Sequence, residues 1–457
     1  MLWLFVTFLL GKSSGFLLPY PVDNEIVWIK NVTPKIIITP YVEAGNIKEA
    51  LDLTLVEPLK GNIVSYAGYV TVDKNCDSNL FFWFFPGKNL EKSPVSVWLQ
   101  GGPGASSLYG LLTENGPYEL TPSGKIKIRK YPWTEISSYM YIDNPVGTGF
   151  SYAKNESCYS KNQNEVGRNL LVGIKQILKL FPTLSSNPFY VTGESYAGKY
   201  VPALAYAIHK DNSANDKINL KGLAIGNGLV DPYNQLIYSD YLYQLGIIDD
   251  YGKDYMKKEE DSCRDYISKN NWIQAFHCFD QLLNGDMTNG STFFNNVTGF
   301  SYYFNYLYSN GRQEGDINNF LNKPYVRSKI HVGDSKFNDG RLVEKHLMED
   351  VMKSVRPWLE ELLEHYKVLI YNGQLDIIVA YPLTKGYLKK LNWSAAGEYK
   401  KAQRHIWRVD NDVAGYVKSA GNLKEVLVRN AGHMVPADQP KWAFDLISRF
   451  FNDKPFY

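Results

Sequence analysis

The 457-residue sequence lacks several features that define large classes of proteins. Lys and Arg number 49 against 47 Asp and Glu, which leaves a net charge of +2, and no stretch is rich in basic residues. A protein that tracks nucleic-acid phosphates needs such a stretch, so nucleic acid is not an expected partner. Beyond the N-terminus no apolar run is long enough to cross a bilayer. No His and Glu cluster has metal-ligand spacing, so neither a metal nor another cofactor is expected.

Cysteine is also scarce, with four residues in the chain. Four cysteines suit two disulfide bonds in an oxidising compartment, and three pairings are possible in principle. Cys263 and Cys278 lie seven residues to either side of Asn270-Asn271. If this Asn pair forms the turn of a helical hairpin, the two thiols meet across it. We therefore predict the bond Cys263–Cys278, which leaves Cys76–Cys158 by elimination.

The N-terminus holds a short apolar run, from Leu2 to Leu10, followed by small residues up to Gly15. A run of this length suits a secretory signal peptide better than a membrane span or a buried strand. We predict that residues 1–15 are a signal peptide and that the mature protein is secreted or lysosomal. Five N-x-S/T sequons support secretion only alongside this segment: Asn31, Asn155, Asn289, Asn296 and Asn392.

The remaining chain has the composition of a folded protein, with 44% hydrophobic and 21% charged residues. Apolar segments bounded by turn residues predict strands at 65–72, 79–85, 95–99, 139–143, 189–191, 223–226, 367–371 and 426–428. The first two form an expected antiparallel edge. Helical periodicity predicts helices at 168–181 and from near Asp438. Strands alternating with helices indicate an α/β fold with a mainly parallel sheet flanked by helices.

This alternation stops after residue 232 and resumes near residue 367. The segment between is helical and polar. An insertion between sheet strands that is built in this way is typical of a cap over an active site. We predict a helical cap at residues 233–350, with the core formed by residues 16–232 and 351–457.

A serine motif stands between a predicted strand and a predicted helix, at residues 193–198 (GESYAG). It follows the G-x-S-x-G pattern, except that Ala197 precedes the second glycine. Small residues flank Ser195 because a sharp strand-to-helix turn must expose its hydroxyl without a clash. The pattern alone is weak evidence, since it also arises by chance. A catalytic serine needs a base, an orienting carboxylate and an oxyanion site.

The remaining parts of such a site follow other predicted strands. His433 lies in a loop directly after a buried strand, whereas the other six histidines lie in helical or polar segments. Asp376 follows the strand at 367–371 and could orient that imidazole. The order Ser195, Asp376, His433 is the order of an α/β-hydrolase. The N–H of Tyr196 and the glycine-rich loop 101–104 could stabilise an oxyanion. That loop lacks the pattern of a phosphate cradle, so nucleotide binding is disfavoured.

Four ordered motifs together resemble the serine carboxypeptidase family. They lie at residues 98–104 (WLQGGPG), 193–198 (GESYAG), 372–376 (NGQLD) and 432–436 (GHMVP). Residues 142–150 match as well, and the resemblance runs from about residue 41 to the C-terminus. Within the family the sequence looks most similar to the vitellogenic-like branch, in which Gln stands at the position of Gln100. The resemblance implies an α/β-hydrolase fold with a helical cap and a serine peptidase that releases C-terminal amino acids.

The resemblance also implies a role for individual residues. Ser195, Asp376 and His433 match the catalytic triad, and Gly102 and Tyr196 match the oxyanion donors. A further group matches the residues that recognise the terminal carboxylate of a peptide: Trp98, Gln100, Gly101, Glu194, Glu114 and Met434. Two departures stand out. Many members have Asn at the position of Gln100, and many have Cys at the position of Ala105, so one family disulfide cannot form here.

If Glu194 and Glu114 lie in contact, as the resemblance implies, their protonation follows from general chemistry. Two buried carboxyls in contact cannot both ionise cheaply, so one keeps its proton. A protonated Glu194 can donate to a substrate carboxylate, and an ionised one would repel it. We therefore expect peptide substrates with a free C-terminus and activity that is best in mild acid.

Two alternatives to a carboxypeptidase stay open at this point. The same triad could serve an acyltransferase, in which an alcohol or amine replaces water. An inactive hydrolase scaffold could act as a binding or carrier protein, although the complete set of Ser195, Asp376, His433 and Gly102 argues against this. The oligomeric state is not indicated by the sequence.

Overall fold

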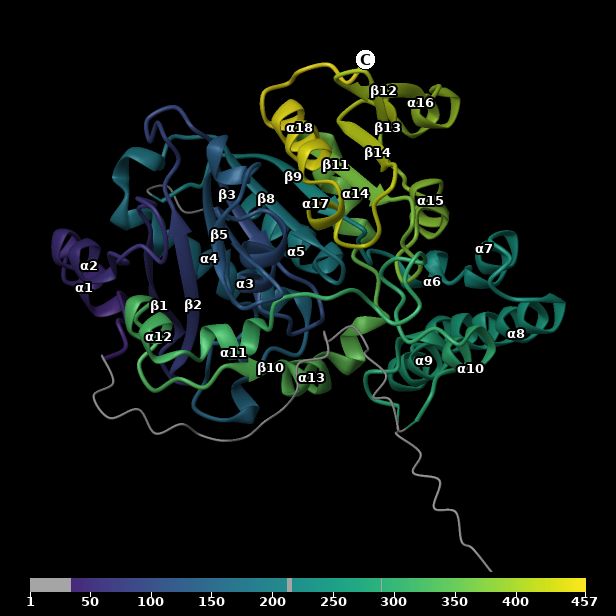
Figure 1. Ribbon diagram of the computed structural model, residues 1–457, viewed down its shortest axis with the longest axis horizontal. Helices are drawn as coiled ribbons and strands as arrows, with labels where there is room; N and C mark the ends of the chain where they lie inside the picture. Colours follow the sequence, from purple (N-terminus) through teal and green to yellow (C-terminus); the bar gives the residue numbers. More distant parts are fainter. Residues whose placement is uncertain (1–33, 212–215, 289) are drawn as a thin grey trace, which may run out of the picture.

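The structure is a computed structural model of the chain and describes residues 34–211, 216–288 and 290–457. The predicted signal peptide and two of the five sequons, at Asn31 and Asn289, lie outside the described residues. Ten strands form the central sheet in the order β1-β2-β6-β3-β8-β9-β11-β14-β13-β12 (Figure 1). Along the chain these strands are β1 Tyr66–Asp73, β2 Ser78–Phe85, β3 Val95–Leu99, β6 Ser138–Ile142, β8 Phe189–Glu194, β9 Leu220–Gly226, β11 Lys367–Gly373, β12 His405–Val409, β13 Asp412–Ala420 and β14 Leu423–Val428.

The middle of the sheet is parallel, and both edges are antiparallel. Strands β6, β3, β8, β9, β11 and β14 run in the same direction, while β1 and β2 close one edge and β13 and β12 the other. All eight predicted strands are present, and the expected antiparallel pair at 65–85 is confirmed. Strands β13 and β12, the last two at one end of the sheet, were not predicted, because their partly buried residues form no continuous apolar run.

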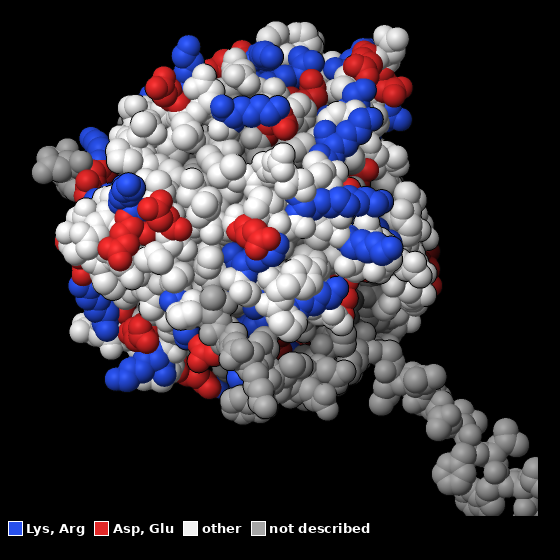
Figure 2. Space-filling model, turned by 60° about the vertical axis from the view of Figure 1, so that its left-hand side comes forward, with Lys and Arg blue, Asp and Glu red and all other residues white. Residues whose placement is uncertain are grey.

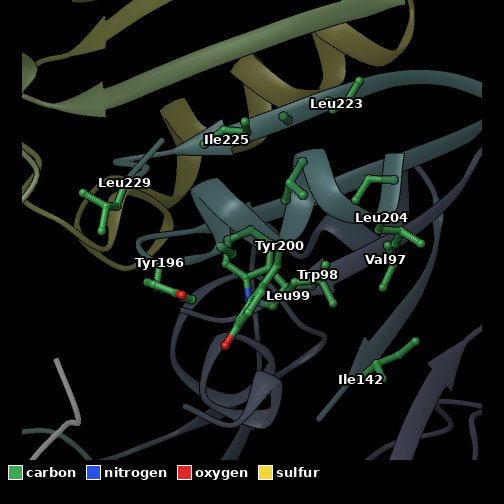
Figure 3. Close-up of a cluster of buried hydrophobic side chains, with 14 of the residues drawn as sticks. Val97, Trp98, Leu99, Ile142, Tyr196, Tyr200, Leu204, Leu223, Ile225 and Leu229 are labelled. Carbon is green, nitrogen blue, oxygen red and sulfur yellow. The ribbon is translucent and has the colours of Figure 1, made fainter. Parts of the chain in front are cut away.

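Helices cover both faces of the sheet, as the α/β prediction requires. Alternate residues of a strand point to opposite faces. On β8, a side chain at Gly193 would contact Ala197 and Val201 of α5, whereas the Tyr190 ring contacts the Phe450 and Phe451 rings of α18. Helix α5 therefore packs on one face and α18 on the other. Figure 3 shows part of the apolar cluster at α5, in which Tyr200 and Leu204 lie beside residues of β3 and which also includes Leu223 and Ile225 of β9.

The described residues between β9 and β11 are mainly helical and include no strand of the central sheet. Helices α8 and α9 form a hairpin whose turn contains Asn270, at a φ of 57°. Both predicted disulfides are confirmed, with Cα–Cα distances of 5.6 Å for Cys263–Cys278 and 5.7 Å for Cys76–Cys158. The function of this segment as a cap, with bounds at 233 and 350, stays a prediction.

The other elements are the helices and two small sheets. Two small sheets pair β4 with β5 and β7 with β10. The bounds are α1 Thr39–Glu43, α2 Ile47–Thr54, α3 Ser107–Tyr109, η1 Gly110–Glu114, β4 Tyr118–Leu120, β5 Ile126–Ile128, η2 Trp133–Glu135, β7 Thr148–Gly149, η3 Glu156–Cys158, α4 Gln163–Leu180, η4 Pro182–Leu184, α5 Ala197–His209, α6 Pro232–Gln235, α7 Tyr238–Gln244, α8 Asp250–Ser268, α9 Trp272–Phe279, η5 Asp280–Asn284, α10 Phe293–Thr298, α11 Ile317–Leu321, α12 Pro324–Lys329, β10 Asn338–Asp339, α13 Arg341–Val351, α14 Arg356–His365, α15 Tyr381–Leu388, α16 Ala396–Lys401, α17 Val435–Asp438 and α18 Pro440–Phe451.

The surface shown in Figure 2 carries basic and acidic side chains interspersed over wide uncharged areas. In the described part of the chain, no helix is long and apolar enough to cross a membrane.

Candidate active site

Ser195 lies at the turn between β8 and α5, at the carboxyl end of its strand. Its backbone has a φ of 65°, which side chains other than glycine rarely adopt. The turn is held on both sides, since the Ser195 N–H donates to Gly226 O at 3.0 Å and the Ser195 carbonyl accepts from Gly198 N at 2.9 Å and Leu229 N at 3.0 Å. A strained strand-to-helix turn of this kind is typical of the position that holds the serine nucleophile in an α/β-hydrolase.

His433 and Asp376 meet at the same edge of the sheet. His433 Nδ1 lies 2.8 Å from Asp376 Oδ2, and both side chains are buried. These residues follow β14 and β11, and Ser195 follows β8, so all three stand beyond the carboxyl ends of parallel strands. His433 Nε2 has no hydrogen-bond partner among the described residues. It is the nitrogen that a serine hydroxyl would use as its base.

Asn227 also contacts Asp376, although no motif in the sequence predicted this role. Its Nδ2 donates to Asp376 Oδ2 at 2.6 Å, and its Oδ1 accepts from Gly373 N at 3.2 Å. It follows β9 with a φ of 43°, next to the Gly226 carbonyl that holds Ser195. Asn227 thereby connects the turn of the serine to the carboxylate of Asp376. The Gly-Asn-Gly sequence at 226–228 is typical of a left-handed turn, and this was the one sequence feature that could have indicated Asn227.

The predicted oxyanion loop lies against the Ser195 turn. A side chain at Gly101 would come within 2.5 Å of Tyr196 N and 2.6 Å of Ser195 Cβ, so only glycine fits there. Gly102 has a φ of 107°, which also requires glycine. Neither the Gly102 N–H nor the Tyr196 N–H donates to another residue in the described part of the chain. Two free N–H groups beside a serine are the requirement of an oxyanion site.

Glu194 and Glu114 are brought together beneath the serine, with Gln100 bridging them. Gln100 Nε2 donates to Glu114 Oε1 at 3.1 Å and to Glu194 Oε1 at 3.3 Å. Trp98 Nε1 donates to Gln100 Oε1 at 2.8 Å, which fixes the orientation of the amide. Both carboxyls are buried, and no N–H or O–H of the described residues donates to either Oε2 atom. One shared proton between the two groups would satisfy both oxygens.

The electrostatics favour that shared proton. Burial raises the pKa of Glu114 to about 7, although hydrogen bonds with Glu194 and Gln100 lower it in part. Burial also raises the pKa of Glu194 well above its usual range, and the charge and hydrogen bond of Glu114 raise it further. Of the two carboxyls, Glu194 is the one whose protonated form the surroundings favour more strongly. Met434, the remaining predicted residue, lies buried directly after His433.

Another buried carboxyl supports the helix that follows the oxyanion loop. Asp143, after β6, accepts from Ser106 Oγ at 2.5 Å, Ser107 N at 3.1 Å and Phe150 N at 2.9 Å. Burial raises the pKa of Asp143 to about 7. In the described residues, no group of three or more His, Cys, Asp or Glu side chains is arranged to hold a metal ion.

Comparison with known proteins agrees with this geometry. The family model described as serine carboxypeptidase matches residues 58–453. The venom serine carboxypeptidase of Apis mellifera is 49% identical over 99% of this chain and 98% of its own, and the vitellogenic carboxypeptidase of Aedes aegypti is 48% identical over 90% and 89%. Kex1, a prohormone-processing carboxypeptidase from Saccharomyces cerevisiae, has the same fold, with a TM-score of 0.75 at 23% identity over 88% of this chain and 96% of its own. The chain belongs to the serine carboxypeptidase family.

Proposed function

We propose that this enzyme releases single residues from the free C-termini of peptides through an acyl-enzyme on Ser195. In the first step the Ser195 hydroxyl attacks the carbonyl of the last peptide bond, and His433 Nε2 takes the hydroxyl proton. Asp376 holds the imidazole through Nδ1 and stabilises the imidazolium that forms. The negative oxygen of the tetrahedral intermediate accepts hydrogen bonds from the N–H groups of Gly102 and Tyr196.

The leaving amino acid and water complete the cycle. The imidazolium of His433 gives its proton to the amine of the departing residue, which leaves an ester on Ser195. Water then attacks the ester with His433 as the base, and the shortened peptide is released. The residues that act in these steps all follow strands of the parallel part of the sheet, at the same edge, which supports their catalytic roles.

The observation that best supports exopeptidase specificity is the buried pair of Glu194 and Glu114. Glu194 is the residue before Ser195, so a terminal carboxylate bound beside it lies one residue from the scissile bond. A protonated Glu194 can donate to that carboxylate, together with the amide of Gln100. Because the pKa values of both carboxyls are raised, the pair still holds a proton in mild acid. As the pH rises the pair ionises, and binding of the terminal carboxylate weakens.

A peptide-library digest tests this function directly. Libraries with free and with amidated C-termini are incubated with the enzyme and with Ser195→Ala, and the products are identified by mass spectrometry. We expect removal of one residue at a time from free C-termini, slower removal from amides, and no products with Ser195→Ala. Internal cleavage, or equal rates on free and amidated peptides, would contradict the proposal.

We also place the enzyme in the secretory pathway, as a secreted or lysosomal protein with peptides or proteins as substrates. The two disulfides support this placement, since such bonds form and persist in oxidising compartments. Culture medium and lysosomal fractions from cells that express the chain would distinguish the two destinations.

A further inference from the structure

Residues 301–314, which we call the strap, run from α10 to α11 without forming a helix or strand. They belong to the predicted cap, yet they contact two loops of the active site and the helix that follows the oxyanion loop. The catalytic triad itself comes from the sheet. The strap is therefore the contribution of the inserted segment to the catalytic centre, and its contacts indicate what that contribution is.

The strap holds both sides of the Asp376 loop through its backbone. Tyr306 N donates to Leu375 O at 3.0 Å, and Ile377 N donates to Tyr303 O at 3.1 Å. These bonds lie on the residues directly before and after Asp376. A backbone held at both neighbours leaves the carboxylate little freedom to move away from the imidazole.

The strap holds the His433 loop even more closely. His433 N donates to Phe304 O at 2.6 Å, and the two rings lie 5.0 Å apart between centroids. Asp438 Oδ2 accepts from Gly432 N at 2.6 Å and from Asn305 Nδ2 at 3.1 Å. Asp438 thus joins the strap to the residue before His433. A hydrogen bond to a charged carboxylate is about twice as strong as one between neutral groups.

An ion-pair chain then connects this histidine loop to the helix after the oxyanion loop. Arg312 Nη1 donates to Asp438 Oδ1, and Arg312 Nε donates to Glu314 Oε1 at 2.8 Å. Tyr109 OH, in α3, donates to Glu314 Oε2 at 2.7 Å. Burial lowers the pKa of Arg312, but Asp438 and Glu314 outweigh this effect and raise it, so Arg312 stays cationic.

We propose that the strap aligns His433 with Ser195, and that Arg312 and Asp438 are the positioning residues through which it acts. This inference rests on the proposed function, because it concerns the same triad. Arg312 fixes the Asp438 carboxylate, and that carboxylate fixes the Gly432 N–H, which sets the backbone of the catalytic histidine. Neither residue takes part in the chemistry.

The test separates positioning from substrate binding and from folding. Arg312→Met, Arg312→Lys and the near-isosteric Asp438→Asn are compared with Arg449→Met. Arg449 is a matched control, since its side chain is 25% exposed, as Arg312 is, and it pairs with Asp445 in α18 at 2.6 Å. For each variant, kcat and KM are measured on a peptide. The rate at which a fluorophosphonate probe labels Ser195 is also measured, because labelling needs the Ser–His pair but no terminal carboxylate.

We expect Arg312→Met to lower kcat and the labelling rate together, by roughly 10- to 100-fold, with KM unchanged, because small displacements of catalytic groups have effects of this size. Arg312→Lys should recover part of the loss, and Asp438→Asn should fall between wild type and Arg312→Met. Arg449→Met should leave both rates unchanged.

Three results would overturn the inference. The first is an unchanged labelling rate in both Arg312→Met and Asp438→Asn. The second is a rise in KM with kcat unchanged, which would make the strap a substrate contact. The third is a loss that disappears when rates are expressed per folded molecule, as measured by near-UV circular dichroism. Failure of the proposed function looks different, because wild-type Ser195 itself would then not be labelled.

Discussion

Asp376 and Glu194 are both buried carboxyls at the same edge of one sheet, and their surroundings are opposite. Asp376 Oδ2 accepts from Asn227 at 2.6 Å and lies 2.8 Å from His433 Nδ1. Glu194 faces a second carboxyl, Glu114, and its Oε2 receives no other hydrogen among the described residues. Donors stabilise a carboxylate, whereas burial beside a like charge keeps a carboxyl protonated. The neighbouring groups, more than the residue type, therefore suit Asp376 to orient a base and Glu194 to bind an anion.

The largest expected effect comes from replacing Asp376 by Asn. This change keeps the shape of the side chain but removes the charge that stabilises the imidazolium, so kcat should fall on the order of 10⁴-fold with little change in KM. Steady-state kinetics on a peptide with a free C-terminus measures it. A loss of less than about tenfold would show that Asp376 does not serve His433 in this way.

Asn227→Ala should have the next largest effect, because it removes one donor from Asp376 while leaving the triad complete. A hydrogen bond to a charged group contributes about 1.5–3 kcal/mol, so kcat should fall by roughly 10- to 100-fold. Asn219→Ala is the control, since Asn219 lies before β9, where its Nδ2 donates to Ser186 O at 2.8 Å. Equal activity of the two variants would mean that Asn227 has no role in holding Asp376.

Glu194→Gln tests the other carboxyl and should act on KM. Gln donates a hydrogen at every pH, whereas Glu194 donates only while protonated. In the wild type KM for a free C-terminus should rise once the pH is high enough to ionise Glu194, whose pKa burial raises well above its usual range. In the variant KM should be nearly independent of pH, with about a tenfold difference between the two proteins at alkaline pH. Initial rates from mild acid to mild alkali measure this. The same rise of KM in both proteins would refute the role of Glu194.

Glu114→Gln should have its main effect on stability. The pKa of Glu114 is raised from 4.5 to about 7 in the folded state, so the folded protein holds a proton that the unfolded chain releases earlier. Stability that depends on this proton is present below pH 4.5 and declines as the pH rises toward 7. The variant should therefore lose less stability between pH 5 and pH 8, by on the order of 1–3 kcal/mol. Urea unfolding at the two pH values provides the measurement, and parallel losses in both proteins would contradict it.

The sequence predicts the sheet because its parallel strands are buried on both faces. Such strands appear as largely apolar runs, for example at 95–99 and 367–371. Strands β12 and β13, at the antiparallel end of the sheet, do not follow this rule, since each buries only part of its side chains and polar residues interrupt its apolar positions. The Cys263–Cys278 bond follows from the symmetry of one turn, which is a local property.

The site could be predicted only where it depends on local context. Ser195, Asp376 and His433 each follow an apolar strand, so their positions are visible along the chain. Asn227 was missed because its partner, Asp376, is 149 residues away. The same holds for Asp438, which contacts Arg312 from another element. The pair of Glu194 and Glu114 was found through the family resemblance, since no spacing rule connects them.

The central claim is that Glu194 keeps its proton at a pH well above the usual range of a carboxyl, because it is buried beside Glu114. Infrared spectroscopy detects protonated carboxyls, and a wild-type minus Glu194→Gln difference spectrum isolates this group from other buried acids whose pKa values are raised, such as Asp143 and Glu344. We predict a protonated-carboxyl band at pH 6.5 that is lost in Glu194→Gln and retained in Asp376→Asn. A wild-type spectrum without that band, or a band that survives in Glu194→Gln, would contradict the account.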